Sequence, residues 1–343
     1  MPKNNEIDFG EIFNLPNPGL RSYFDIVRRG QPDVFRTTFA KGQSVESVLD
    51  EWKPTLDSIS DTWPSLLDFE NDLKAKVGPM SVMKPLSERM DDIEHYYADI
   101  LLSATPVSDK ALRAVVAELS PVRGLLVRSQ DRTVDKMKLS TNSGAPYFTK
   151  RRNVVDKTLW CNSMMPPGDI GGVMLQGIHQ LSDISRLLPQ FRTDPNASVW
   201  FPCAVLGWRG QEGGPLDVDT KQRVVWMFPF AVNVNELQVY QPLIESCQKF
   251  NLVPAWSSME AVDRGITLMF DTKGVDDMVI CTDFSRFDQH FNSELQTATA
   301  TILQNLLTDN RDSKFWLHNV FPIKYKIPLA YDYGKVRYGK HGM

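Results

Sequence analysis

The stretch Val279-Ile280-Cys281-Thr282-Asp283-Phe284-Ser285-Arg286-Phe287-Asp288-Gln289-His290-Phe291-Asn292 joins an apolar run to two carboxylates. Because β-forming apolar residues lead into Asp283, we expect a short buried strand over 278–284 that ends at this carboxylate. Asp288 follows after a turn. Mg²⁺ binds hard oxygen ligands, few of them from protein, and substrate phosphates complete its octahedron. By spacing alone the pair is more typical of a strand end and an Asp-rich turn than of a metal site. The neighbouring residues are therefore needed to distinguish the two.

Those neighbours, DFSRFDQHFN at 283–292, resemble motif A of viral RNA-dependent RNA polymerases, most closely that of picobirnaviruses. The resemblance implies that Asp283 binds the catalytic Mg²⁺, with Mn²⁺ as an alternative ion, helped by the backbone carbonyl of Phe284. It also implies that Asp288 senses the ribose 2′-hydroxyl, which distinguishes ribonucleotides from deoxyribonucleotides. Arg286 has two open interpretations: it reaches a nucleotide phosphate, or it balances the two carboxylates.

A second segment, STNSGAPY at 140–147, is predicted to form a turn, since Gly permits a positive φ and Pro fixes the backbone after it. In isolation it is also typical of an ordinary polar loop. It resembles polymerase motif G, which guides the template strand into the site. The template-binding residues that this resemblance implies are Thr141, Ser143, Gly144, Pro146, Lys150 and Arg151.

Two β-rich runs, 198–208 and 223–228, are joined by a polar loop. Arg209 ends the first run, and Lys221 and Arg223 open the second. This arrangement resembles motif F, the fingertip strands whose basic residues hold the incoming nucleoside triphosphate. A triphosphate needs cationic groups while charge spreads in the transition state, and the planar fork of arginine suits that task.

The net charge of −4 argues mildly against a dedicated nucleic-acid binder, but the charge is unevenly distributed. Residues 121–157 hold nine basic side chains against three acidic ones. The nine are Arg123, Arg128, Arg132, Lys136, Lys138, Lys150, Arg151, Arg152 and Lys157. Such a stretch can attract phosphate over roughly 8–10 Å, although a solvated basic face is an equal alternative.

Four scattered cysteines form no CxxC pair, which favours reduced thiols over disulfides or zinc. No segment approaches the roughly 18 consecutive apolar residues of a membrane-spanning helix, so we expect no membrane association.

Helical patterns mixed with a few strands indicate an α+β class. We expect helices at 44–58 (broken at Pro54), 109–119, 235–250, 259–270 and 293–307, and a hairpin turning near 332–334. The resemblance implies a right-hand polymerase of fingers, palm and thumb. Of this architecture we expect a helical N-terminal extension at 1–120, fingers with the template-guiding loop and fingertip strands at 121–275, and the start of the palm at 276–343.

The family also has motif B, a Gly/Ser-rich loop, and motif C, which bears two adjacent aspartates; neither is found in the sequence. Asp276-Asp277 is predicted to be a polar turn, and Asp91-Asp92 a solvated part of an amphipathic helix. Two-metal nucleotidyl transfer needs carboxylates on both metals. We therefore expect an incomplete polymerase chain that is inactive by itself.

The resemblance thus implies an RNA-directed RNA polymerase that replicates and transcribes a viral RNA genome. Its expected partners are template and product RNA, nucleoside triphosphates and a viral capsid protein. We expect it in the virion interior and the host cytoplasm. The alternative is a catalytically inactive, polymerase-derived protein that binds RNA or acts in assembly.

Overall fold

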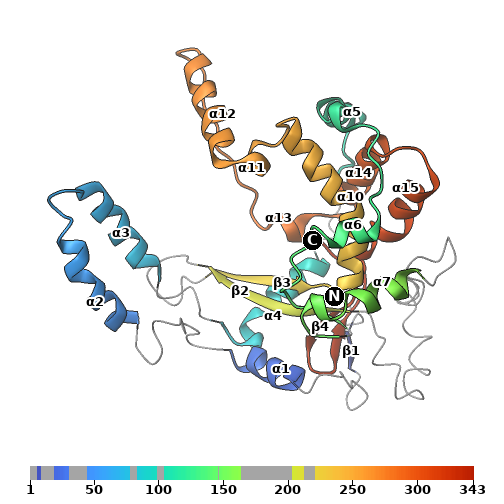
Figure 1. Cartoon of the computed structure of the whole chain (residues 1–343), viewed down its shortest axis with the longest axis horizontal. Helices are drawn as coiled ribbons and strands as arrows, with labels where there is room; N and C mark the ends of the chain where they lie inside the picture. The colour runs from blue at the N-terminus through green and yellow to red at the C-terminus, as the bar shows by residue number, and fades with distance from the viewer. Residues whose placement is uncertain are drawn as a thin grey trace.

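The computed structural model describes residues 6–8, 19–30, 45–77, 83–98, 104–145, 147–163, 203–211 and 221–343. Helices surround a small sheet (Figure 1), which confirms the expected mixture of helix and strand. Pro146 and the loop residues 212–220 lie outside the described residues.

Within the described residues, the sheet has five strands in the order β1-β5-β4-β2-β3. The strands are β1 (Glu6–Asp8), β2 (Ala204–Gln211), β3 (Lys221–Met227), β4 (Leu329–Asp332) and β5 (Lys335–Arg337). Neighbouring strands are antiparallel except for β2 and β4, which are parallel. The β4–β5 hairpin turns at Gly334, whose φ of 82° lies in the left-handed region, as the sequence predicted.

The helices of the first half are α1 (Gly19–Arg29), α2 (Val45–Asp57), α3 (Pro64–Val77), α4 (Leu86–Ala98), α5 (Asp109–Glu118), η4 (Ser120–Val122), α6 (Gln130–Val134), η5 (Arg151–Asn153) and α7 (Val155–Ser163). Those of the second half are α10 (Phe230–Lys249), α11 (Pro254–Ser257), α12 (Met259–Thr272), α13 (Phe287–His290), α14 (Ser293–Leu306), α15 (Arg311–Phe315), η9 (Trp316–Val320) and η10 (Ile323–Tyr325). Figure 1 shows α2 and α3 as a pair that projects from the body.

Helix ends follow local chemistry closely. Ser108 caps α5 and Ser258 caps α12, each hydroxyl accepting a hydrogen bond from a backbone N–H in the first turn.

The expected break at Pro54 is wrong, because α2 continues through this residue. Proline removes one helical hydrogen bond. Here the carbonyl left without its donor belongs to the exposed Asp50, where water can replace the lost bond.

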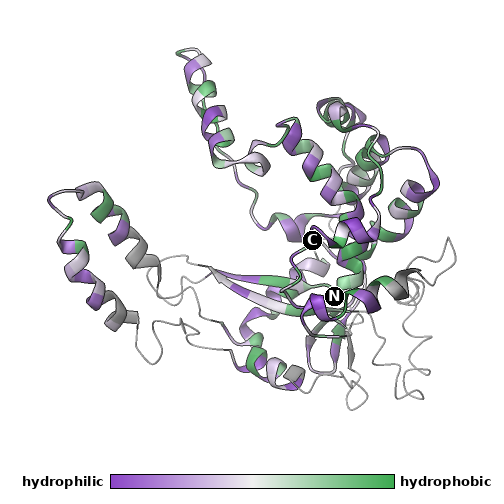
Figure 2. Ribbon diagram, viewed as in Figure 1, coloured by the Kyte–Doolittle hydropathy of each residue, from purple (hydrophilic) through white to green (hydrophobic). Residues whose placement is uncertain are grey.

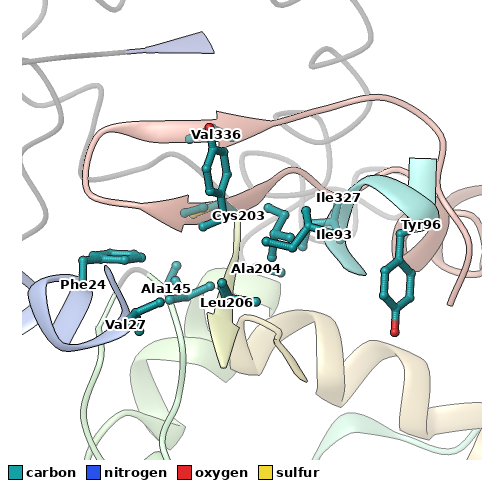
Figure 3. Packing of buried hydrophobic residues seen from close by; sticks show 14 of the residues in the cluster. Phe24, Val27, Ile93, Tyr96, Ala145, Cys203, Ala204, Leu206, Ile327 and Val336 are labelled. Atoms are coloured by element: carbon teal, nitrogen blue, oxygen red, sulfur yellow. The ribbon is translucent and has the colours of Figure 1, made fainter. Parts of the chain in front are cut away.

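The main hydrophobic core lies between the sheet and the helices α1 and α4 (Figure 3). Phe24 of α1 and Ile93 of α4 are completely buried against Ala204 of β2 and Val336 of β5. A second core joins α10 and α14 around Trp316, which is 1% exposed and donates its indole N–H to the Asn235 carbonyl at 2.7 Å. Burying such a side chain stabilises the fold by roughly 2–3 kcal/mol.

The predicted buried strand at 278–284 is wrong for this structure. These residues lie in no strand or helix, and Ile280 and Phe284 are 76% and 72% exposed. A strand needs a neighbour to pair its backbone groups, and no described strand lies beside this segment. The preceding α12 also projects from the body with apolar residues along it (Figure 2), among them Leu268 at 61% exposed.

Among the described helices, none is both long enough and apolar enough to cross a membrane.

Candidate active-site cleft

A cleft of about 660 Å³ lies between the start of β3, the turn at 283–289 and the helix α4. Residues predicted to bind nucleotide and metal line it together: Lys221, Arg223, Asp283, Arg286 and Asp288. The β3 residues and the turn are far apart in the sequence. The fold therefore unites the two groups of residues in one site.

The β3 wall presents two cations. Lys221 and Arg223 alternate with the half-buried Gln222, so both side chains point to the exposed face of the strand. The backbone of Arg223 is held from behind, because its carbonyl accepts a hydrogen bond from the buried Arg89 at 3.4 Å. Arg209 lies opposite Arg223 in the β2–β3 register and is exposed, but it does not line the cleft.

The opposite wall carries the two predicted carboxylates, Asp283 and Asp288, both exposed. Between them Arg286 adopts a φ of 52°, a left-handed conformation that costs roughly 1–2 kcal/mol in a non-glycine residue. This bend reverses the chain before α13. The Arg286 Nη1 atom lies 3.2 Å from each ring nitrogen of His95 on α4. Arg286 therefore contacts α4 as well as the cleft.

The third wall of the cleft is formed by α4, and it was not predicted from the sequence. Asp92 and Tyr96 of α4 line the cleft, and Asp92 is half-buried. Burial, together with the nearby carboxylates of Asp288 and Asp92, raises the pKa of Tyr96 to about 12. The Gln289 side chain donates to the Asp92 carbonyl at 3.2 Å. The sequence pattern of α4 indicates an amphipathic helix but cannot show that its polar face meets a segment so distant in sequence.

The donor chemistry of Asp283 fits a partly built Mg²⁺ site. Its exposed carboxylate faces a cleft whose other wall holds Lys221 and Arg223. An ion held there would keep water and substrate phosphates as its remaining ligands, the arrangement Mg²⁺ prefers. Among the described residues, no group of three or more His, Cys, Asp or Glu side chains could hold a metal by itself.

The predicted turn at 140–147 lies at the far end of β3. The Gly144 φ is 63°, and its N–H donates to the Asn142 side chain at 2.7 Å. Ser143 is completely buried, and its hydroxyl accepts from the Thr149 N–H at 3.2 Å, so in this structure it holds the turn. Thr141 is exposed, and its hydroxyl donates to the Lys138 carbonyl at 3.1 Å.

Behind the turn, the predicted basic residues divide into two kinds. Lys150 and Arg152 are exposed. The Arg151 guanidinium is half-buried over the Phe230 ring, 5.4 Å from its centroid, and burial lowers the pKa of Arg151. The turn and the cleft lie at opposite ends of β3. Because this strand has seven residues, they are roughly 20 Å apart.

Comparison with known proteins shows the family of the chain. Residues 127–332 match the family of viral RNA-dependent RNA polymerases. A potential RNA-dependent RNA polymerase of human picobirnavirus (strain Human/Thailand/Hy005102/-) is 54% identical over 335 residues, which are 98% of this chain and 59% of that protein. The crystal structure of the RNA-dependent RNA polymerase of a human picobirnavirus matches with a TM-score of 0.74 and 53% identity, over 96% of this chain and 61% of that one. An insertion-loop deletion mutant of the same kind of enzyme matches with the same values.

The fold is that of a nucleic-acid polymerase with mixed helices and sheet. The chain belongs to the viral RNA-dependent RNA polymerase family. It spans about three-fifths of the length of the picobirnavirus relatives it matches.

Proposed function

We propose that this chain forms the nucleotide-binding part of an RNA-dependent RNA polymerase that replicates and transcribes a viral RNA genome. The observation that carries the proposal is the single cleft that holds Lys221 and Arg223 on one wall and Asp283 and Asp288 on the other. Cations and carboxylates facing one another across about 660 Å³ suit a magnesium–triphosphate substrate. The reaction is attack of an RNA 3′-hydroxyl on the nucleotide α-phosphate, with release of pyrophosphate.

Each side chain has a role set by its position. Lys221 and Arg223 bind the triphosphate, since β3 projects both toward the cleft. Asp283 would hold Mg²⁺, or Mn²⁺ in its place, and the ion when bound would neutralise phosphate charge. Asp288 accepts a hydrogen bond from the ribose 2′-hydroxyl. Arg286, held beside α4 by His95, contacts a phosphate or offsets the carboxylates.

We also propose that the 343 residues are an incomplete polymerase: the N-terminal extension, the fingers and the start of the palm. The exposed apolar segment 278–284 supports this, because its unpaired backbone and side chains such as Ile280 need a covering strand. So does the lack, within the described residues, of a complete cluster of metal ligands. Residues on further palm strands would supply the carboxylates for the second metal.

The expected partners follow from this activity. Template and product RNA would pass the turn at 140–147, with Arg209 and the exposed Lys150 within the reach of their phosphates. A viral capsid protein is a further partner that we propose, with action inside the virion and in the host cytoplasm.

A first experiment measures nucleotide binding by the chain as it stands. Equilibrium dialysis with radiolabelled ATP and MgCl₂ should show binding that Arg223→Gln weakens by about 10- to 100-fold, the loss of one charge-assisted contact. Arg264→Gln, on the exposed surface of α12, is the matched control and should bind ATP as the unaltered chain does. Unchanged ATP binding by Arg223→Gln would show that Arg223 on β3 does not bind the triphosphate.

A second experiment measures synthesis after the chain is fused to the part of the human picobirnavirus polymerase that it does not cover. Templated incorporation of labelled nucleotide should fall by a factor on the order of 10³ in Asp283→Asn. Asp288→Asn should instead reduce the preference for ribonucleotides over deoxyribonucleotides. Asp263→Asn, an exposed aspartate of α12, is the control. Full incorporation by Asp283→Asn contradicts the proposed site.

The alternative, an inactive protein that binds RNA or acts in assembly, has one observation in its favour: the incomplete metal ligand set among the described residues. A fusion that binds RNA and ATP but incorporates no nucleotide in Mg²⁺ or Mn²⁺ would support it.

A further inference from the structure

A second groove, of about 690 Å³, lies away from the cleft. It is formed by the segment 121–129, the start of α6 and the second half of α10. Three arginines line it, Arg123, Arg128 and Arg132, and its lining, all within the described residues, includes no carboxylate. The groove therefore concentrates positive charge on a chain whose net charge is −4.

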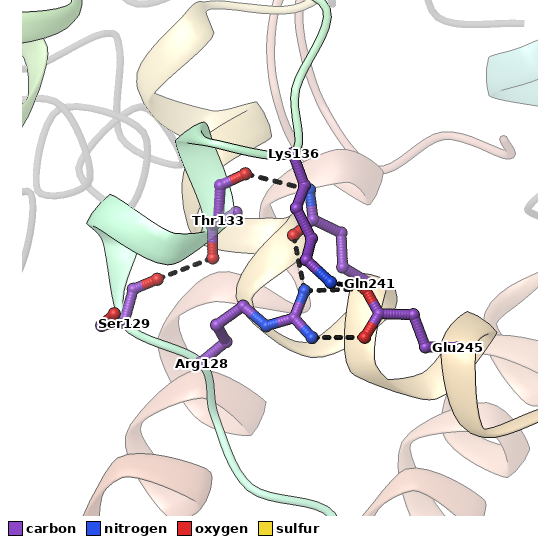
Figure 4. Close-up of polar contacts among 6 residues, drawn as sticks. All are labelled: Arg128, Ser129, Thr133, Lys136, Gln241 and Glu245. Atoms are coloured by element: carbon purple, nitrogen blue, oxygen red, sulfur yellow. Dashed lines mark hydrogen bonds and ion pairs between the residues drawn. The ribbon is translucent and has the colours of Figure 1, made fainter.

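Only two of these arginines are available to a ligand. The Arg128 guanidinium binds both carboxylate oxygens of Glu245, at 3.0 and 2.5 Å, and the Gln241 side chain at 3.0 Å (Figure 4). Arg123 and Arg132 are exposed and have no ion pair within the described part of the chain.

The groove is held rigid by its backbone contacts. The N–H groups of Gly124 and Leu125 donate to the Leu306 carbonyl at the end of α14, at 2.9 and 3.0 Å. The Arg128 N–H donates to the Gln238 carbonyl of α10 at 2.9 Å. The segment is therefore fixed on two helices, and a ligand would find the groove already formed.

The lining suits an RNA strand better than a free phosphate. Leu126 also lines the groove, and at 60% exposed it offers an apolar surface to a ribose or a base. Arginine recognises phosphate, and alternating cations and apolar contacts hold single strands without reading their sequence. The groove and the predicted template turn lie at different places along α10. The turn accepts a hydrogen bond from the Phe230 N–H at the start of the helix, whereas Pro242 and Ser246 line the groove roughly 18–24 Å further along.

We propose that this groove binds the phosphates of single-stranded RNA through Arg123 and Arg132. It would hold the strand outside the nucleotide cleft, beside the second half of α10. This rests on the proposed function, which supplies RNA as the ligand, but it adds a contact surface that the cleft residues do not form.

The test uses the 343-residue chain and a fluorescein-labelled oligouridylate of about 20 nucleotides, with fluorescence anisotropy measured over a range of salt concentrations. Each phosphate contact to a single strand contributes about 0.7 to the slope of log affinity against log salt. Replacing both residues, Arg123→Gln with Arg132→Gln, should reduce this slope by about 1.4 and weaken binding at about 0.1 M salt by roughly 25-fold.

The matched control removes two exposed cations elsewhere, Lys53→Gln on α2 with Arg264→Gln on α12. It should retain the slope of the unaltered chain. Far-ultraviolet circular dichroism should show that both double variants fold, since all four side chains are exposed. An unchanged slope in the groove variant, or no RNA binding by the unaltered chain, overturns the proposal. The anisotropy measurement depends on neither ATP binding nor nucleotide incorporation. A failure of the proposed nucleotide cleft can therefore be distinguished from a failure of the proposed groove.

Discussion

Gly342 lies so close to Gln289 that a Cβ atom at position 342 would be 2.5 Å from the Gln289 carbonyl oxygen. The Gly342 N–H donates to the Tyr96 carbonyl of α4 at 2.8 Å. Residue 342 thus lies between α4 and α13, two of the elements that form the cleft. The position of the Asp288 carboxylate depends on a residue far from it in sequence.

Gly342→Ala should therefore weaken nucleotide binding as well as the fold. The added methyl group must displace backbone rather than a flexible side chain, so we expect a loss of about 1–3 kcal/mol in the free energy of unfolding. Urea unfolding and ATP dialysis measure the two effects. The control is Gly265→Ala on α12, where a Cβ meets nothing within 4 Å and helix propensity predicts stabilisation by roughly 0.5–1 kcal/mol. Equal behaviour of the two variants would contradict this account.

Gly144→Ala should disrupt the template turn. Its φ of 63° is unfavourable for alanine, and a Cβ would lie 2.5 Å from the Phe228 carbonyl oxygen. We expect destabilisation of more than about 2 kcal/mol, measured by thermal unfolding. Gly124→Ala separates the two causes, because Gly124 has a φ of 84° but nothing within 4 Å of a Cβ. It should lose only about 1 kcal/mol; a larger loss than in Gly144→Ala would be inconsistent with the clash.

Features of the fold that depend on nearby residues could be predicted from the sequence, whereas features that depend on distant residues could not. The turn at 140–147 and the starts of the helices expected at 109–119 and 259–270 depend on chemistry within a few residues, so their patterns sufficed. The segment 278–284 was predicted to be a buried strand from its apolar residues, yet pairing depends on a neighbouring strand that local pattern cannot supply. The α4 wall of the cleft was missed for a similar reason.

The cleft itself was predicted only in part. Residue types around Asp283 and Arg223 indicated chemistry, and the resemblance to polymerase motifs indicated that they belong together. The structure places them on one cleft, but it places Arg209 outside it and buries Ser143. Side-chain direction along a strand or turn depends on the register and on packing, which the motif pattern does not specify.

Glu245 should stabilise the fold in a pH-dependent way. Hydrogen bonds from Arg128 and Lys136 lower the pKa of Glu245 from 4.5 to about 2. Its contribution is therefore fully present above about pH 4.5 and is lost as the pH falls toward 2. Because the carboxylate is 42% exposed, we expect Glu245→Gln to cost only on the order of 1 kcal/mol at pH 7. Urea unfolding should show that this difference disappears near pH 2; a constant difference across the range would argue against the ion pair.

Glu236 should affect the pH dependence of folding stability in the opposite direction to Glu245. Burial raises the pKa of Glu236 from 4.5 to about 7, although Lys324 opposes the shift. Its Oε1 atom is buried and has no hydrogen-bond partner among the described residues. A raised pKa means that this residue favours folding below about pH 4.5 and that the contribution is lost as the pH rises through 7. Glu236→Gln keeps the shape without the charge, so relative to the unaltered chain it should gain stability on the order of 1–3 kcal/mol between pH 4.5 and 8. Urea unfolding at both pH values measures this, with the exposed Glu118→Gln as control. If Glu236→Gln and the unaltered chain lose stability in parallel as the pH rises, Glu236 does not titrate within the core.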